Sequence, residues 1–160
     1  MKKLKAYKNM QYNITPAQLG QRPQVQLPDP RILEHLGENG MRKLISDHYN
    51  LLKQSNIRGL FPPTDEGFEM AKKHSSDFFI QICGGERHFD KNRGAPRMVG
   101  RHAPFTITLE ARRIWLESYI MVLSTLDISD ELKESFWNYL DIFSIWMVNT
   151  PSEPNNQFHT

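Results

Sequence analysis

The chain has 160 residues, of which 39% are hydrophobic and 11% aromatic, so it can bury the core of one globular domain. Its net charge of +2 is too small to indicate a nucleic-acid partner by charge alone. A single cysteine, Cys83, excludes an internal disulfide framework and all-thiolate zinc or iron–sulfur sites within one chain. No apolar run approaches the roughly 18 residues of a membrane span, and no signal-peptide pattern follows the basic start. We therefore expect a cytoplasmic protein without membrane contact.

Residues 1–37 lack sustained apolar periodicity and carry early lysines followed by glutamine, proline and glycine. This composition predicts an extended arm that packs on the domain or frays, with a short helical turn that ends near Gly37. A helix is expected shortly afterwards, because apolar residues recur there at steps of three and four. That spacing places Tyr49 on the buried face. The segment 58–63 predicts a corner, with Phe61 held before two prolines.

The next helix is predicted to begin at Thr64, with acidic residues in its first turn and Gly84-Gly85 as its stop. Its inner face combines small residues with aromatic ones: Phe68, Ala71, Ser75, Phe78, Phe79 and Ile82. A serine inside an aromatic face suits a pocket better than a closed core. Residues 86–100 are then expected to form a long irregular loop, and loops of that length are usually functional.

His102 follows this loop at the end of an expected short helix, because Pro104 cannot continue a helix. Two further helices are predicted from the N-caps Thr108 and Ser129, and Pro151 closes the last of them. No strand pattern is present, so the sequence predicts an all-α protein.

Six histidines are present, but none has HExxH spacing and no cysteine–histidine cluster exists, which disfavours the usual zinc sites. Taken alone, His102 would more often be a surface or structural residue than a ligand. Haem is a flat, apolar, anionic cofactor that needs aromatic walls, an axial histidine and cations for its carboxylates. A haem site with His102 as its iron ligand would therefore account for these residues together.

Five motifs follow one another at a spacing that, taken together, is more specific for a protein family than any single motif. They are Gly84-Gly85, Arg93-Gly94-Ala95-Pro96-Arg97-Met98, Arg101-His102-Ala103-Pro104-Phe105-Thr106-Ile107, Ala111-Arg112-Arg113-Ile114-Trp115-Leu116 and Met147-Val148-Asn149-Thr150-Pro151. Over residues 38–151 the chain resembles the group II truncated globins. Residues 1–37 would then be an N-terminal extension and residues 152–160 a C-terminal tail.

The resemblance implies a truncated globin fold, a two-over-two helical sandwich around one haem b. His102 would be the proximal iron ligand, while Tyr49 and Trp115 would donate hydrogen bonds on the distal side. Phe61 would wedge the haem at the corner, and Ala71 would take the distal position that is histidine in ordinary globins.

Two positions depart from the pattern of the group. Ser75 falls where leucine or glutamine is usual, which implies a wetter distal side, and Phe61 replaces a frequent tyrosine, which removes one hydrogen bond to the ligand. His74 and Arg101 fall where cations often meet the haem propionates. The other residues expected to contact haem are Phe78, Phe79, Phe89, Met98 and Phe105.

The implied function is binding of dioxygen, nitric oxide and carbon monoxide at the haem iron. Dioxygen gains partial negative charge on ferrous haem, and a hydrogen bond to a charged acceptor contributes about 1.5–3 kcal/mol. Donation from both Tyr49 and Trp115 predicts slow oxygen release, or redox chemistry, rather than simple oxygen transport.

Two alternatives stay open. A haem enzyme, such as a nitric oxide dioxygenase or a peroxidase, would have the same site and would need a reductase partner, because no reductase domain is present in this chain. A helical binding module could instead grip nucleic acid or a protein through its basic loop, which contains Arg87, Lys91, Arg93, Arg97 and Arg101. The module leaves the spacing of the pocket residues unexplained, so no nucleic-acid partner is expected. Group relatives often form dimers, so a homodimer is also open.

Overall fold

The computed structural model describes residues 10–152. In that range the regular structure is helical and contains no strand, which confirms the predicted all-α class. The elements in chain order are α2 (Arg31–Lys53), the short 3-10 helix η1 (Arg58–Leu60), α3 (Asp65–Ile82), α4 (His88–Arg93), α5 (Met98–His102), α6 (Leu109–Ser124) and α7 (Asp130–Met147). None of these helices is long and apolar enough to cross a membrane. The expectations for residues 1–9 and 153–160 lie outside the described part.

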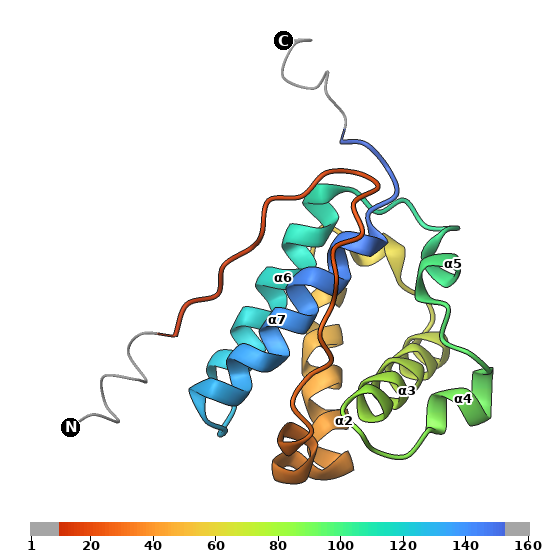
Figure 1. The fold of residues 1–160 in the computed structure, drawn as a ribbon. Helices are drawn as coiled ribbons and strands as arrows, with labels where there is room; N and C mark the ends of the chain where they lie inside the picture. Colours follow the sequence, from red (N-terminus) through yellow and green to blue (C-terminus); the bar gives the residue numbers. More distant parts are fainter. Residues whose placement is uncertain (1–9, 153–160) are drawn as a thin grey trace.

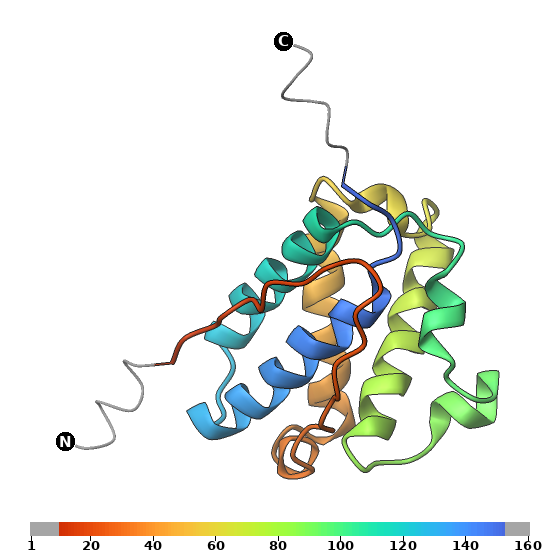
Figure 2. The same cartoon turned by 45° about the horizontal axis from the view of Figure 1, so that its top comes forward.

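The four long helices form the predicted two-over-two sandwich. Helices α6 and α7 run antiparallel and side by side, and α2 crosses behind them (Figures 1 and 2). Helix α2 also packs along α3 and on α6, so it joins the two pairs. The short helices α4 and α5 follow α3 and lie on its far side from α6 (Figures 1 and 2).

Local capping explains where the long helices begin. The hydroxyl groups of Thr64, Thr108 and Ser129 each accept a hydrogen bond from a backbone N–H three residues on, as N-caps do. The predicted helix starts are therefore confirmed. Gly37 interrupts α2 with φ 69° and ψ 172°, so the break expected there is also confirmed. Only glycine adopts such a conformation without strain.

The segment before His102 is more regular than expected, and the prediction of an irregular loop over residues 86–100 was wrong. It contains α4 and the beginning of α5. Helix α4 is held by Phe89, which is 3% exposed, and by Gln81, whose side-chain amide donates to Asp90 at 2.9 Å. These contacts come from α3, so the local sequence did not reveal them. Helix α5 ends at His102, as predicted.

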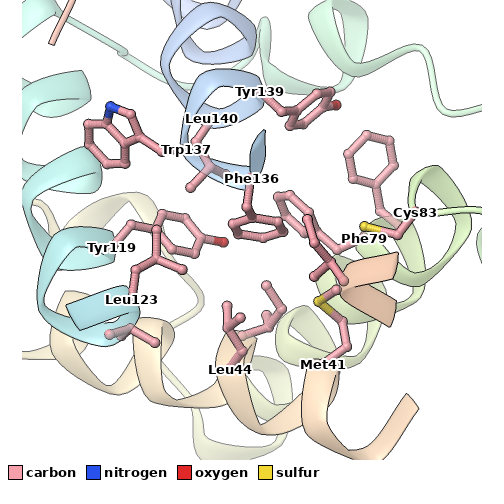
Figure 3. Packing of buried hydrophobic residues seen from close by; sticks show 14 of the residues in the cluster. Met41, Leu44, Phe79, Cys83, Tyr119, Leu123, Phe136, Trp137, Tyr139 and Leu140 are labelled. Atoms are coloured by element: carbon pink, nitrogen blue, oxygen red, sulfur yellow. The ribbon is translucent and has the colours of Figure 1, made fainter. Parts of the chain in front are cut away.

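One aromatic-rich core fills the space between the long helices (Figure 3). Helix α2 contributes Met41 and Leu44, α3 contributes Phe79, α6 contributes Tyr119 and α7 contributes Phe136, all at most 3% exposed. Full burial of such a side chain stabilises the fold by about 1.5–3 kcal/mol. This core lies beside the predicted pocket and holds its helices in place.

Helix α6 is buried on a wider surface than its sequence suggested. Steps of three and four along the sequence place Ala111, Ile114 or Trp115, Ser118, Val122 and Leu126 on one face, but Leu116 and Tyr119 are also fully buried. The reason is that α6 packs on both α2 and α7, so two sides of the helix are covered. A pattern with a single apolar stripe describes only helices that pack on one neighbour.

Residues 10–30 run as an extended strap over α6 and α7 (Figures 1 and 2). The indole N–H of Trp137 donates to the Asn13 carbonyl at 2.9 Å, and that of Trp146 donates to the Pro23 carbonyl at 2.7 Å. The backbone N–H of Asp29 donates to the Ser135 hydroxyl at 2.8 Å. Of the two predicted behaviours of the arm, packing on the domain is therefore the one seen for residues 10–30.

Candidate functional site

A cavity of about 520 Å³ opens between α3, α5, α6 and the corner at η1. Its volume is in the usual range for a ligand or cofactor site. The thirteen side chains singled out from the sequence all line it: Tyr49, Phe61, Ala71, His74, Ser75, Phe78, Phe79, Phe89, Met98, Arg101, His102, Phe105 and Trp115. Residues separated by up to 66 positions along the chain are thus brought to one place.

His102 lies at the C-terminal end of α5 on one side of the cavity. Its Nδ1 is 2.7 Å from the Met98 carbonyl oxygen. A carbonyl only accepts hydrogen bonds, so Nδ1 carries the proton and Nε2 is the unprotonated nitrogen. Burial lowers the pKa of His102, against a smaller opposite effect of the Met98 hydrogen bond. The ring is therefore neutral near pH 7 and offers one nitrogen lone pair to a metal.

Arg101 organises the backbone that leads to His102. Its guanidinium donates to the carbonyls of Arg93, Ala95 and Pro96 at 2.8, 2.9 and 2.5 Å. It also lies over the ring of Phe89, 5.1 Å from the centroid. These bonds use Nε and Nη2, so Nη1 is the part of the group that can meet a further acceptor.

His74 contributes a buried polar atom that has no partner in the described structure, namely its Nδ1. Burial lowers its pKa, and the nearby charges of Arg93, Lys73 and Arg101 add to that effect. An uncompensated polar atom beside several cations is unfavourable by itself. A carboxylate of a bound molecule would supply both the acceptor and the negative charge that this edge of the cavity lacks.

Tyr49 and Trp115 also line the cavity, on α2 and α6. The ring of Tyr49 packs edge-on against Phe61, with centroids 5.4 Å apart. Burial raises the pKa of Tyr49, while a side-chain hydrogen bond with Ser75 acts in the opposite direction. The phenol therefore stays protonated and can donate. Ala71 and Ser75 of α3 line the same cavity and carry small side chains.

The sequence interpretation missed a buried ion pair in the cavity wall. Arg112 and Ser144 line the cavity, and Arg112 Nη2 lies 2.6 Å from Asp141 Oδ1. The same guanidinium donates to the Ser144 hydroxyl at 2.8 Å and to the Thr15 carbonyl at 2.9 Å. Thr15 belongs to the strap, so the strap takes part in holding this wall. An arginine within a helix reads as solvent-exposed in sequence, and no local signal indicated its distant partners.

Comparisons with known proteins agree with this geometry. The sequence pattern of the family "Bacterial-like globin" matches residues 32–149. Group 2 truncated hemoglobin 3-1 of Lotus japonicus is 26% identical over 136 residues, which cover 82% of this chain and 80% of that protein. Group 2 truncated hemoglobin YjbI of Bacillus subtilis is 26% identical over 117 residues, covering 72% and 86%. The crystal structure of phosphate-bound Hell's gate globin IV superposes with a TM-score of 0.79 at 34% identity and covers 88% of this chain and 89% of its own.

The chain therefore belongs to the bacterial-like globin family, and within it to the group II truncated haemoglobins. Membership of this family implies haem as the cofactor. The residues present fit such a group, because one neutral imidazole, aromatic walls and an unsatisfied cationic edge meet in a single cavity.

Proposed function

We propose that this protein holds haem b through His102 and binds diatomic gases, dioxygen, nitric oxide and carbon monoxide, with Tyr49 and Trp115 as hydrogen-bond donors. The observation that carries the proposal is the 2.7 Å hydrogen bond from His102 Nδ1 to the Met98 carbonyl, in the wall of an apolar cavity. That bond selects the tautomer and the ring orientation that a proximal ligand requires.

When bound, the haem supplies an iron centre with an open position for a diatomic ligand. His102 would hold that centre through Nε2, and the Met98 carbonyl would increase the basicity of the ring by accepting from Nδ1. His74 and the Nη1 group of Arg101 would receive the two carboxylates, which satisfies the buried Nδ1 of His74. The aromatic residues Phe61, Phe78 and Phe89 would pack on the ring system and exclude water.

On the distal side the chain decides which ligands are retained. The Tyr49 O–H and the Trp115 N–H favour a ligand with partial negative charge, and each such bond contributes about 1.5–3 kcal/mol. Acting on dissociation, that free energy slows ligand release by roughly 10- to 100-fold. Ser75 lines the same cavity as Tyr49, opposes the effect of burial on the pKa of that phenol, and makes this side more polar. We therefore favour slow oxygen release over oxygen transport.

A visible spectrum of the purified protein, reduced and then treated with carbon monoxide, tests the cofactor assignment. We expect a red protein with an intense Soret band that shifts on addition of carbon monoxide. A preparation that stays colourless after haem is added would refute the proposal and favour the helical binding module. Turnover of nitric oxide or peroxide, supported by an added reductase, would identify the protein as a redox enzyme with the same site.

A further inference from the structure

His48 lies directly behind the distal wall of the cavity. It precedes Tyr49 on α2, is 0% exposed and is not one of the residues that line the cavity. Its Nε2 is 3.0 Å from the carbonyl oxygen of Trp115. Because that carbonyl can only accept, Nε2 carries the hydrogen and Nδ1 is left as an acceptor. This Nδ1 is buried and has no partner among the described residues.

The ring of His48 also connects the two distal donors through aromatic contacts. It stacks on Tyr119 with centroids 3.4 Å apart and an angle of 17° between the planes. It meets the indole of Trp115 edge-on at 5.4 Å and the phenol of Tyr49 edge-on at 6.2 Å. Tyr119 in turn contacts Trp115 edge-on at 4.9 Å. Four rings from α2 and α6 thus form one cluster behind the cavity.

A histidine is an unfavourable choice for a position with only a packing role. A phenylalanine would fill a similar volume without leaving a buried nitrogen unpaired, which destabilises a fold. The Trp115 carbonyl does not need His48 either, because a helix carbonyl already accepts from the amide four residues on, here that of Tyr119. Burial lowers the pKa of His48 to about 3, so the ring keeps its single N–H on the α6 backbone throughout the physiological pH range.

We propose that His48 is a positioning residue for the distal pair. Its hydrogen bond to the Trp115 carbonyl and its stacking on Tyr119 hold α6 in register with α2. The register determines how far the Trp115 indole N–H lies from the Tyr49 hydroxyl. His48 thereby sets how well both donors reach one ligand, and with it the preference for dioxygen over the less polar carbon monoxide. The inference rests on the proposed function, since it assumes that these donors act on a bound ligand.

Two substitutions separate the hydrogen bond from the packing. His48→Phe keeps a stacking ring and removes the N–H, while His48→Gln restores an N–H donor at the distance of Nε2. Tyr139→Phe, which removes a buried hydroxyl that lies outside both the cavity and this cluster, is the matched control. We expect His48→Phe to raise the dioxygen dissociation rate by about 3- to 10-fold, the value of one neutral hydrogen bond. The carbon monoxide rate should change by less than about 2-fold, and His48→Gln should recover most of the dioxygen effect.

A measurement independent of ligand kinetics uses the indole N–H signals of the three tryptophans in the NMR spectrum of the diamagnetic carbon monoxide form. Trp137 and Trp146 serve as internal standards, because their N–H groups donate to Asn13 and Pro23, away from His48. The Trp115 signal should shift in His48→Phe while these two stay unchanged. An unchanged Trp115 signal, or an equal shift of all three, would overturn the positioning role. If the Trp115 signal shifts but Tyr49→Phe and Trp115→Phe leave dioxygen dissociation unaltered, the positioning stands and the distal part of the proposed function fails.

Discussion

The two sides of the cavity are built in different ways. On the proximal side, Arg101 and His102 bond to backbone carbonyls between four and eight residues earlier in the chain. On the distal side, His48 reaches the Trp115 carbonyl across 67 positions, and the ring of Tyr49 packs edge-on against Phe68 of α3. The proximal geometry is therefore a local property of one motif, whereas the distal geometry depends on how three helices pack.

The tautomers of His102 and His48 show the same difference. His102 bonds through Nδ1 and keeps Nε2 for a ligand, while His48 bonds through Nε2 and keeps a buried Nδ1 without a partner. In each ring, a hydrogen bond to a backbone carbonyl determines which nitrogen carries the proton. That carbonyl lies in the same short helix for His102 and in another helix, far along the chain, for His48. The comparison predicts that proximal changes affect haem retention and that distal changes affect ligand kinetics.

The largest expected effect is on the proximal side. His102→Ala removes the nitrogen that holds the cofactor, so the purified protein should carry little haem, measured as Soret absorbance per protein. Added imidazole should restore part of the band by filling the vacated position. His35→Ala, which alters an exposed histidine on α2, is the control and should retain full occupancy. A normal spectrum at equal occupancy in His102→Ala would show that another group holds the iron.

The next effect concerns the cavity wall that distant segments hold together. Asp141→Asn removes the negative charge from a pair in which the side chains of Arg112 and Asp141 are 4% and 8% exposed. Breaking a buried pair from one side leaves an uncompensated charge, so the free energy of unfolding should fall by about 3 kcal/mol. Urea unfolding of the variant and of Asp127→Asn, which alters an exposed carboxylate, provides the comparison. Equal stabilities would mean that the pair contributes nothing to the wall.

Distal changes should leave haem bound and alter ligand release. Tyr49→Phe removes one donor, and the dioxygen dissociation rate should rise by roughly 10- to 100-fold. Stopped-flow mixing of the dioxygen form with carbon monoxide measures that rate. Tyr139→Phe removes a buried hydroxyl that lies outside the cavity and should have no effect. Equal rates for wild type and Tyr49→Phe would exclude Tyr49 as the stabilising donor.

The smallest effect is a pH dependence that distinguishes His48 from a simple packing residue. Burial lowers the pKa of His48 to about 3 in the folded state, from an ordinary value near 6.5. Below that ordinary value the unfolded chain binds the proton and the folded chain does not, so stability falls as the pH falls. Between pH 7 and 5 the loss from His48 is about 2 kcal/mol.

Urea unfolding of wild type and His48→Phe at both pH values isolates this contribution, because the acidic groups that also weaken the fold at low pH are the same in both proteins. The variant should lose about 2 kcal/mol less than the wild type between the two pH values. Parallel losses would show that His48 binds a proton in the folded protein.

The elements that sequence reasoning predicted are those with a local cause. Thr64, Thr108 and Ser129 cap the first turn of their own helices, and Gly37 breaks α2 by its own backbone conformation. The elements that it missed depend on partners elsewhere. Helix α4 exists because Phe89 and Asp90 are held by α3, and no pattern within residues 86–100 records that contact.

The same distinction applies to the candidate site. The sequence by itself determined the class of fold, the starts of three capped helices and thirteen of the residues that line the cavity, because motif spacing and N-caps are properties of neighbouring residues. Only the tertiary structure decided which nitrogen of each histidine is free, that Arg112 is buried against Asp141, and that His48 stands behind the distal donors. The physical reason is that burial and hydrogen-bond partners across helices arise from packing, and packing joins residues that the order of the chain keeps apart.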